Sequence, residues 1–191
     1  MLNVPMIRYS SLLALVLVPA SLMAHPGHGE VQAVSAALHP WQGLDHLLAM
    51  LAVGALGWRL GGKATWALPA TFVGGMCLGT LLSVLGLPGF GVEWIIAASV
   101  VLLGALIALP RLPTARWLAV PLLIGALAHG HAHGAELGGA AIPFFVISTA
   151  VLHALGAGAA WLAVRQGNLL SLRIAGGTVA TAGLWLCLGL A

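Results

Sequence analysis

The stretch from His39 to Met50, HPWQGLDHLLAM, places imidazole and carboxylate side chains at the start of a long apolar segment. A charged side chain inside a bilayer is costly, so an intramembrane aspartate is by default a candidate functional residue. With Pro40 in the first turn of a helix, Asp45 and His46 lie about 8–10 Å further along its axis. His39 and His46 then share nearly one face, with Asp45 about 100° around from His46. Because imidazole and carboxylate bind divalent transition metals, we expect this helix to carry a metal into the membrane.

A second group of histidines lies in the string AHGHAHGAE, residues 128–136. The spacing of His129, His133 and Glu136 is i, i+4, i+7, which makes one stripe on a helix. His131 points to the opposite side, and we expect it to be a polar rim residue. His153 lies near the middle of a later apolar stretch and is expected to be the deepest of these groups.

A single intramembrane histidine more often bonds between helices than binds a metal. This chain, however, has eight histidines and four acidic residues in all, and most of them fall in these two motifs. Ordered by depth they form a descending series, in which each ligand can replace water that an ion loses. At its outer end, the free amine of a cleaved chain and the imidazole of His25 could chelate a metal, and a disordered polar terminus is the alternative. We therefore expect metal handling.

The composition defines a membrane protein. Of 191 residues, 61% are hydrophobic and 6% are charged, against roughly 25% charged in soluble domains. The few basic residues lie between apolar runs, which excludes nucleic-acid binding. Cys77 and Cys187 have no metal-binding spacing and are expected to be structural thiols. The glycines before Lys63 resemble part of a phosphate-binding loop, but Ala64 replaces the required Ser or Thr, so ATP binding is not expected.

Residues 1–24 are typical of a cleaved secretory signal peptide, although an uncleaved first helix is the alternative. The mature part, residues 25–191, then forms one all-α polytopic permease domain of six transmembrane helices. Each apolar stretch is close to the roughly 20 residues that a bilayer requires. The stretches are 40–60, 64–87, 91–110, 114–135, 140–165 and 168–190.

The basic residues predict the orientation. On this topology all six that follow the signal peptide fall on one side, which the positive-inside rule assigns to the cytoplasm. The mature N-terminus is then periplasmic, as export of a signal-bearing chain requires. These residues are Arg59, Lys63, Arg111, Arg116, Arg165 and Arg173.

The spacing of His39, Asp45 and His46 within HPWQGLDHLLAM resembles the signature of the HupE/UreJ family of hydrogenase- and urease-associated nickel permeases. The string HGHAHGAE resembles that family's second motif, and the signal and six-helix pattern fit along the mature chain. The resemblance implies uptake of nickel, or of cobalt, across the inner membrane of a bacterium. It implies ligand roles for His39, Asp45, His46, His129, His133 and Glu136. We add His153 to these candidate ligands because of its predicted depth in the membrane. We add His25 because it would lie beside the free amine of the cleaved chain.

Several alternatives stay open on the residues alone. Imidazole with carboxylate suits nickel and zinc alike, and raw affinity favours copper, so a copper or zinc carrier is a rival. A membrane metallohydrolase would use Glu136 as its base, but the H-E-x-x-H pattern is absent. A b-type haem protein would use histidines as axial ligands. We expect a non-enzyme without prosthetic group or ATP, whose partners are the bilayer and a transported dication.

Overall fold

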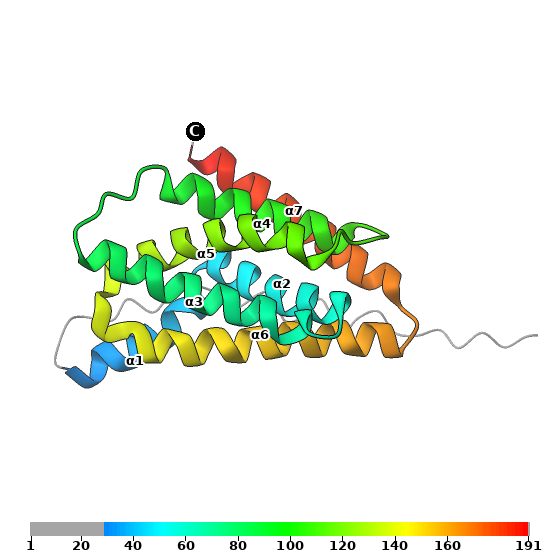
Figure 1. Cartoon of the computed structure of the whole chain (residues 1–191), viewed down its shortest axis with the longest axis horizontal. Coiled ribbons are helices and arrows are strands. Elements are labelled where there is room, and N and C mark those ends of the chain that lie inside the picture. Colours follow the sequence, from blue (N-terminus) through cyan, green and yellow to red (C-terminus); the bar gives the residue numbers. More distant parts are fainter. Residues whose placement is uncertain (1–28, 191) are drawn as a thin grey trace, which may run out of the picture.

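The computed structural model describes residues 29–190 and, within them, is built from helices without any strand (Figure 1). The predicted signal peptide and His25 lie outside the described residues, so those predictions stay predictions. The elements are α1 (Gly29–Gln42), α2 (Leu44–Leu60), α3 (Ala64–Val84), α4 (Val92–Ala108), α5 (Ala115–Leu137), the 3-10 turn η2 (Gly139–Ala141), α6 (Ile142–Arg165) and α7 (Leu169–Gly189).

Helices α2 to α7 correspond to the six predicted apolar stretches, and the all-helical class is confirmed. Three described helical segments are long and apolar enough to cross a membrane: Ala64–Val84, Gly139–Arg165 and Leu169–Gly189. Val92–Ala108 is a shorter apolar helix. Of the remaining two, α2 has 17 residues, and both α2 and α5 carry buried histidines, namely His46, His129 and His133. The chain is thus a multi-pass membrane protein, while the count of six spans stays a prediction.

The prediction that Pro40 opens the first membrane helix is wrong. His39 and Pro40 lie in the last turn of a separate helix, α1, and α2 begins only at Leu44. The alanine-rich segment before His39 favours a helix of its own. Pro40, which has no N–H to donate, lies two residues before the end of that helix. Gly43 has an extended backbone, φ −80° and ψ 118°, which separates the two helices.

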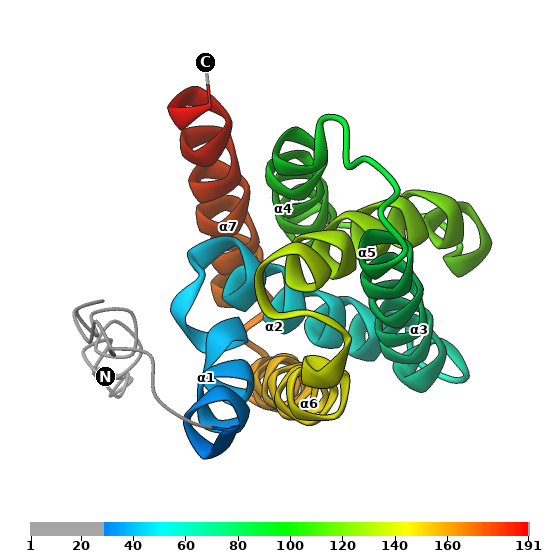
Figure 2. The same cartoon turned by 90° about the vertical axis from the view of Figure 1, so that its left-hand side faces the viewer.

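The helices pack in three intimate pairs: α2 along α6, α3 along α5, and α4 along α7 (Figures 1 and 2). Small residues allow this, since backbones in a membrane approach closely where side chains are absent. A Cβ at Gly79 of α3 would collide with the carbonyl oxygen of Leu127 in α5. A Cβ at Gly54 of α2 would collide with the carbonyl oxygen of His153 in α6. The same absence of side chains therefore brings His153 against α2.

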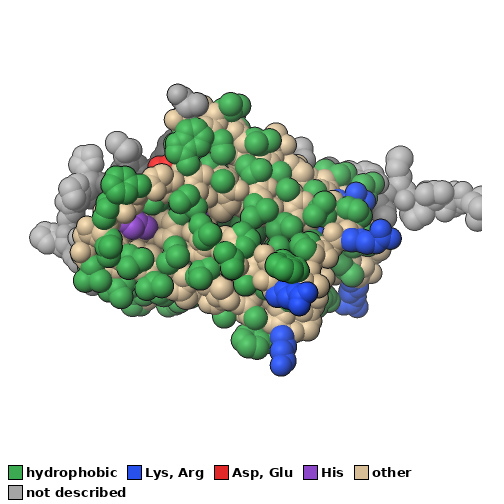
Figure 3. Space-filling view, turned by 45° about the horizontal axis from the view of Figure 1, so that its top comes forward, with side chains coloured by type: hydrophobic (Ala, Val, Ile, Leu, Met, Phe, Trp, Pro, Cys, Tyr) green, Lys and Arg blue, Asp and Glu red, His purple; other side chains and the backbone are tan. Residues whose placement is uncertain are grey.

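Charge is separated along the long axis of the molecule. Figure 3 shows Lys and Arg side chains gathered at one end, with histidine visible at the other. At the basic end, Arg59 of α2 donates hydrogen bonds to carbonyl oxygens at the carboxyl end of α4, at 2.6 Å to Ile107 and 3.0 Å to Leu109. Arg173 of α7 donates to Ala108 at 2.9 Å. Cations are favourable at a helix C-terminus, so these contacts join α2 and α7 to α4.

Candidate metal site

Three histidines from three helices meet at the end opposite the basic residues. One ring nitrogen from each of His39, His46 and His133 lies within 4.8 Å of the others. The ring centroids are 4.6 Å apart for His46 and His133, 5.0 Å for His39 and His133, and 5.7 Å for His39 and His46. His133 is fully buried and His46 is 5% exposed. We call these residues the three-histidine cluster.

The break at Gly43 positions two members of this cluster. His39 ends α1 and His46 lies in the first turn of α2, so they meet across the break rather than along one face of a helix. A Cβ at Gly43 would lie 2.8 Å from Asp45 Oδ1 and 3.3 Å from His46 Nδ1. The absence of a side chain at Gly43 therefore leaves room for the Asp45–His46 contact.

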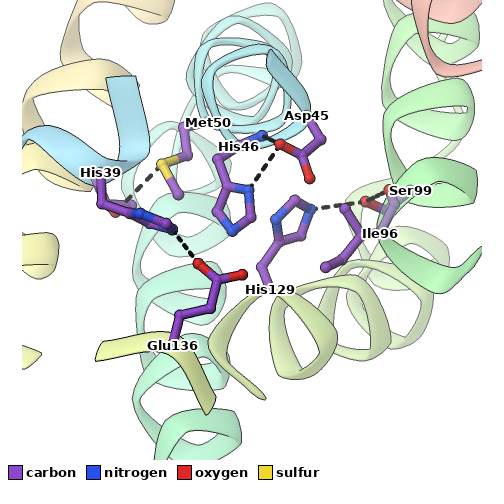
Figure 4. A network of polar contacts seen from close by, with 9 residues as sticks. His39, Asp45, His46, Met50, Ile96, Ser99, His129 and Glu136 are labelled. Atoms are coloured by element: carbon purple, nitrogen blue, oxygen red, sulfur yellow. Dashed lines mark hydrogen bonds and ion pairs between the residues drawn. The ribbon is translucent and has the colours of Figure 1, made fainter. Parts of the chain in front are cut away.

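Each predicted carboxylate contacts one histidine of the cluster (Figure 4). Asp45 Oδ1 lies 2.9 Å from His46 Nδ1 and accepts the His46 backbone N–H at 2.8 Å. Glu136 Oε2 lies 3.0 Å from His39 Nε2, and the Glu136 side chain is 53% exposed. A carboxylate on the far nitrogen of a metal-binding histidine fixes the tautomer and the orientation of the ring. These contacts are those expected of carboxylates that orient the rings of His46 and His39.

The cluster contains buried polar atoms without a hydrogen-bond partner among the described residues. They are Nε2 of His46 and both ring nitrogens of His133. An unsatisfied buried polar atom costs about 1–3 kcal/mol, so most such groups in proteins are paired. The His133 ring also stacks on Phe145, with centroids 4.7 Å apart and planes 7° from parallel. The stacking holds the ring of His133 in place, and its nitrogens, which have no partner in the described chain, are available to a cation.

His129, one turn before His133 on α5, lies on the inner side of the cluster. It is fully buried, and its ring centroid is 4.7 Å from that of His46. Its Nε2 lies 3.1 Å from Ser99 Oγ of α4, while its Nδ1 has no partner among the described residues. The stripe predicted for His129, His133 and Glu136 thus faces the other histidines along α5.

His153 of α6 lies apart from the cluster, on the far side of an aromatic ring. Phe72 of α3 is fully buried, with its ring centroid 5.6 Å from His129 and 5.7 Å from His153. His153 is 4% exposed, and neither ring nitrogen has a hydrogen-bond partner in the described chain. A cation that passed His129 would therefore meet a second buried imidazole further along.

His131 does not take part in the cluster. Its Nε2 lies 2.9 Å from the carbonyl oxygen of Leu87, in the connection between α3 and α4. The prediction that it lies on the other side of its helix is confirmed. Sequence reasoning missed Ser99 and Phe72. A lone serine in an apolar stretch could have indicated a polar contact between helices, whereas a phenylalanine there gives no such signal.

An open cavity of about 240 Å³ borders the acidic edge of the cluster. It lies between α1, the end of α5, η2 and the start of α6. Glu136, which contacts His39, is part of its wall, so the cavity reaches the residues next to the cluster. Its other lining residues include Ala33, Ser35, Ala36, Leu137 and Phe144.

Fold and site together define a helical multi-pass membrane protein with a buried, histidine-rich polar core. The family model described as HupE / UreJ protein matches residues 13–186. Protein HupE of Rhizobium leguminosarum bv. viciae is 38% identical over 188 residues, which cover 95% of this chain and 98% of that relative. The chain therefore belongs to the HupE/UreJ family. No solved structure matches it.

Proposed function

We propose that this protein carries Ni²⁺, with Co²⁺ as a second cargo, across the bacterial inner membrane as a secondary permease or facilitator. The observation that carries the proposal is the three-histidine cluster, whose ring nitrogens converge within 4.8 Å and include buried atoms with no partner in the described chain. A dication that arrives from water replaces its lost water ligands with these nitrogens. The HupE/UreJ family is associated with nickel and cobalt transport for hydrogenase and urease.

The proposed path runs from the open cavity beside Glu136 to the three-histidine cluster, then past His129 to His153. In this series Asp45 and Glu136 act through His46 and His39, holding the rings and offsetting part of the positive charge. Further in, the cavity below Ser99 has a volume of only about 10 Å³ and a mainly apolar lining that includes Leu56, Leu103 and Leu122. Such an apolar lining offers few ligands to a dication, so in the proposed mechanism the helices move to release the ion.

The membrane potential is sufficient to drive such uptake. Moving one elementary charge through 100 mV is worth about 2.3 kcal/mol, so a dication gains about 4.6 kcal/mol. This corresponds to an accumulation of roughly three decades in concentration. The proposed mechanism consequently needs no ATP.

The proposal is tested by initial rates of radiolabelled nickel uptake in a host that lacks its own nickel transporters. We expect His46→Ala and His133→Ala to lower uptake at least about ten-fold at equal expression, because each removes a ligand from the cluster. His131→Ala is the matched control: it removes a histidine from the same helix as His133, but one that contacts the Leu87 carbonyl instead. Uptake at wild-type rates in both cluster variants would exclude the proposed path.

Metal identity is tested in the same assay by competition, since histidine ligands alone bind nickel, zinc and copper. We expect excess unlabelled Ni²⁺ and Co²⁺ to suppress labelled uptake more strongly than Zn²⁺ does. Stronger suppression by Zn²⁺ or copper than by unlabelled nickel would favour the copper or zinc carrier.

A further inference from the structure

Ser99 makes two contacts that together determine where the proton of His129 lies. Its Oγ is 2.7 Å from the carbonyl oxygen of Ile96 and 3.1 Å from His129 Nε2 (Figure 4). A hydroxyl has one hydrogen to donate, and a carbonyl oxygen can only accept. For both contacts to be hydrogen bonds, the Ser99 hydrogen must go to Ile96 and the Ser99 oxygen must accept a hydrogen bond from His129. For that bond to exist, Nε2 of His129 must carry the proton.

A neutral imidazole has one N–H, so a proton on Nε2 leaves a lone pair on Nδ1. In His129 this Nδ1 is fully buried and has no hydrogen-bond partner in the described part of the chain. The same logic applies to His46: its Nδ1 faces Asp45 at 2.9 Å, and its Nε2 is the nitrogen without a partner. The two rings, 4.7 Å apart between centroids, thus each keep one lone pair for a ligand.

From this geometry we infer that Ser99 is a positioning residue that holds His129 in its Nε2–H tautomer, so that His46 and His129 form a second station for the dication. The inference rests on the proposed function. His46 belongs to both sites, because its ring lies 4.6 Å from His133 and 4.7 Å from His129. An ion leaving the three-histidine cluster can therefore keep one ligand while it gains the next.

The packing around Ser99 supports this role. Gly125 lies on α5, one turn before His129, and a Cβ there would stand 2.9 Å from Ser99 Cβ. The lack of a side chain at Gly125 lets α4 approach α5 at the level where Ser99 reaches the imidazole. Ser99 is buried, so water is not freely available to replace its oxygen.

The tautomer is measured directly in the full chain, with ¹⁵N-labelled histidine, purified in detergent without metal. Correlation spectra distinguish the two neutral tautomers of imidazole, and the His129 signals are identified by their loss in His129→Gln. We expect the Nε2–H form in the wild type and a mixture of both forms in Ser99→Ala. An Nδ1–H form in the wild type, or an unchanged tautomer in Ser99→Ala, would overturn the inference.

Transport is measured with a double-mutant cycle. We expect Ser99→Ala to lower the rate of nickel uptake about ten-fold, and the double variant Ser99→Ala/His129→Gln to be no slower than His129→Gln alone, because Ser99 acts through His129. Thr178→Ala is the matched control, since it removes a hydroxyl whose partner within the described residues is the carbonyl of Ile174 in its own helix, at 3.1 Å. Additive losses in the double variant would show an independent structural role for Ser99 and overturn the inference.

The two proposals fail in different ways. Absence of nickel uptake by the wild type would overturn the proposed function, and the second station with it. Nickel uptake by a wild type whose His129 carries its proton on Nδ1 would overturn the role of Ser99 alone.

Discussion

At the scale of single residues, Asp45 orients His46. Its Oδ1 contacts the ring Nδ1 of His46 and also accepts the backbone N–H of His46. An asparagine oxygen can still accept these hydrogen bonds, but the substitution removes the negative charge that, in the proposed mechanism, stabilises a cation bound to the ring. We expect Asp45→Asn to lower nickel uptake by about 10–100-fold, the range seen for residues that orient metal ligands. Uptake rates at matched expression measure this. An unchanged rate would mean that only the hydrogen bonds matter.

Acidification is expected to weaken uptake, because protons compete with the cation for the same ring nitrogens. The sign follows from the ligand chemistry: a ring nitrogen that has bound a proton cannot bind a metal, so protons and the cation exclude each other. Initial rates measured between about pH 7 and pH 5 at a fixed membrane potential should therefore fall steadily. A rate that rose over this range would contradict the ligand role of the histidines.

At the scale of elements, the dominant feature is close contact between helices. A substitution at Gly79 tests its contribution to stability. Its Cβ would collide with the carbonyl of Leu127, so we expect Gly79→Ala to separate α3 from α5 and lower the free energy of unfolding by about 1–3 kcal/mol. Gly74, in the same helix, has open space where a Cβ would stand. Gly74→Ala should therefore leave stability unchanged or raise it by up to about 1 kcal/mol. Thermal or denaturant unfolding in detergent distinguishes the two variants.

The elements show what the sequence can and cannot predict. Helices α2 to α7 follow from the length of their apolar runs. The separate helix α1 does not, because Gly43 interrupts the backbone inside what looks like one motif. The spacing of His39 and His46 correctly predicts that their side chains lie close together, but for the wrong reason, since they meet across a break. Which helices pack against each other also cannot be predicted from the sequence, because the core-facing and lipid-facing surfaces of these helices are equally apolar.

At the scale of the whole molecule, the separation of charge predicts an orientation. The basic end should face the cytoplasm, and α7 runs away from it, so the C-terminus should lie on the periplasmic side with the histidines (Figure 1). We expect alkaline phosphatase fused after residue 191 to be active, and phosphatase fused in the connection between α2 and α3 to be inactive. The reverse pattern would place the three-histidine cluster at the wrong face for uptake.

The bonds of Arg59 and Arg173 to the end of α4 also have a mechanical consequence. They fasten α2, α4 and α7 together at the basic end, and α6 is held to α2 by the contact at Gly54. None of these bonds reaches the α3–α5 pair, which contacts the group through Ser99 and His129. His46 and His153 belong to the group, whereas His129 and His133 belong to the pair. The dication would thus lie between the α3–α5 pair and the other group of helices, where a small rocking of one against the other would exchange its ligands.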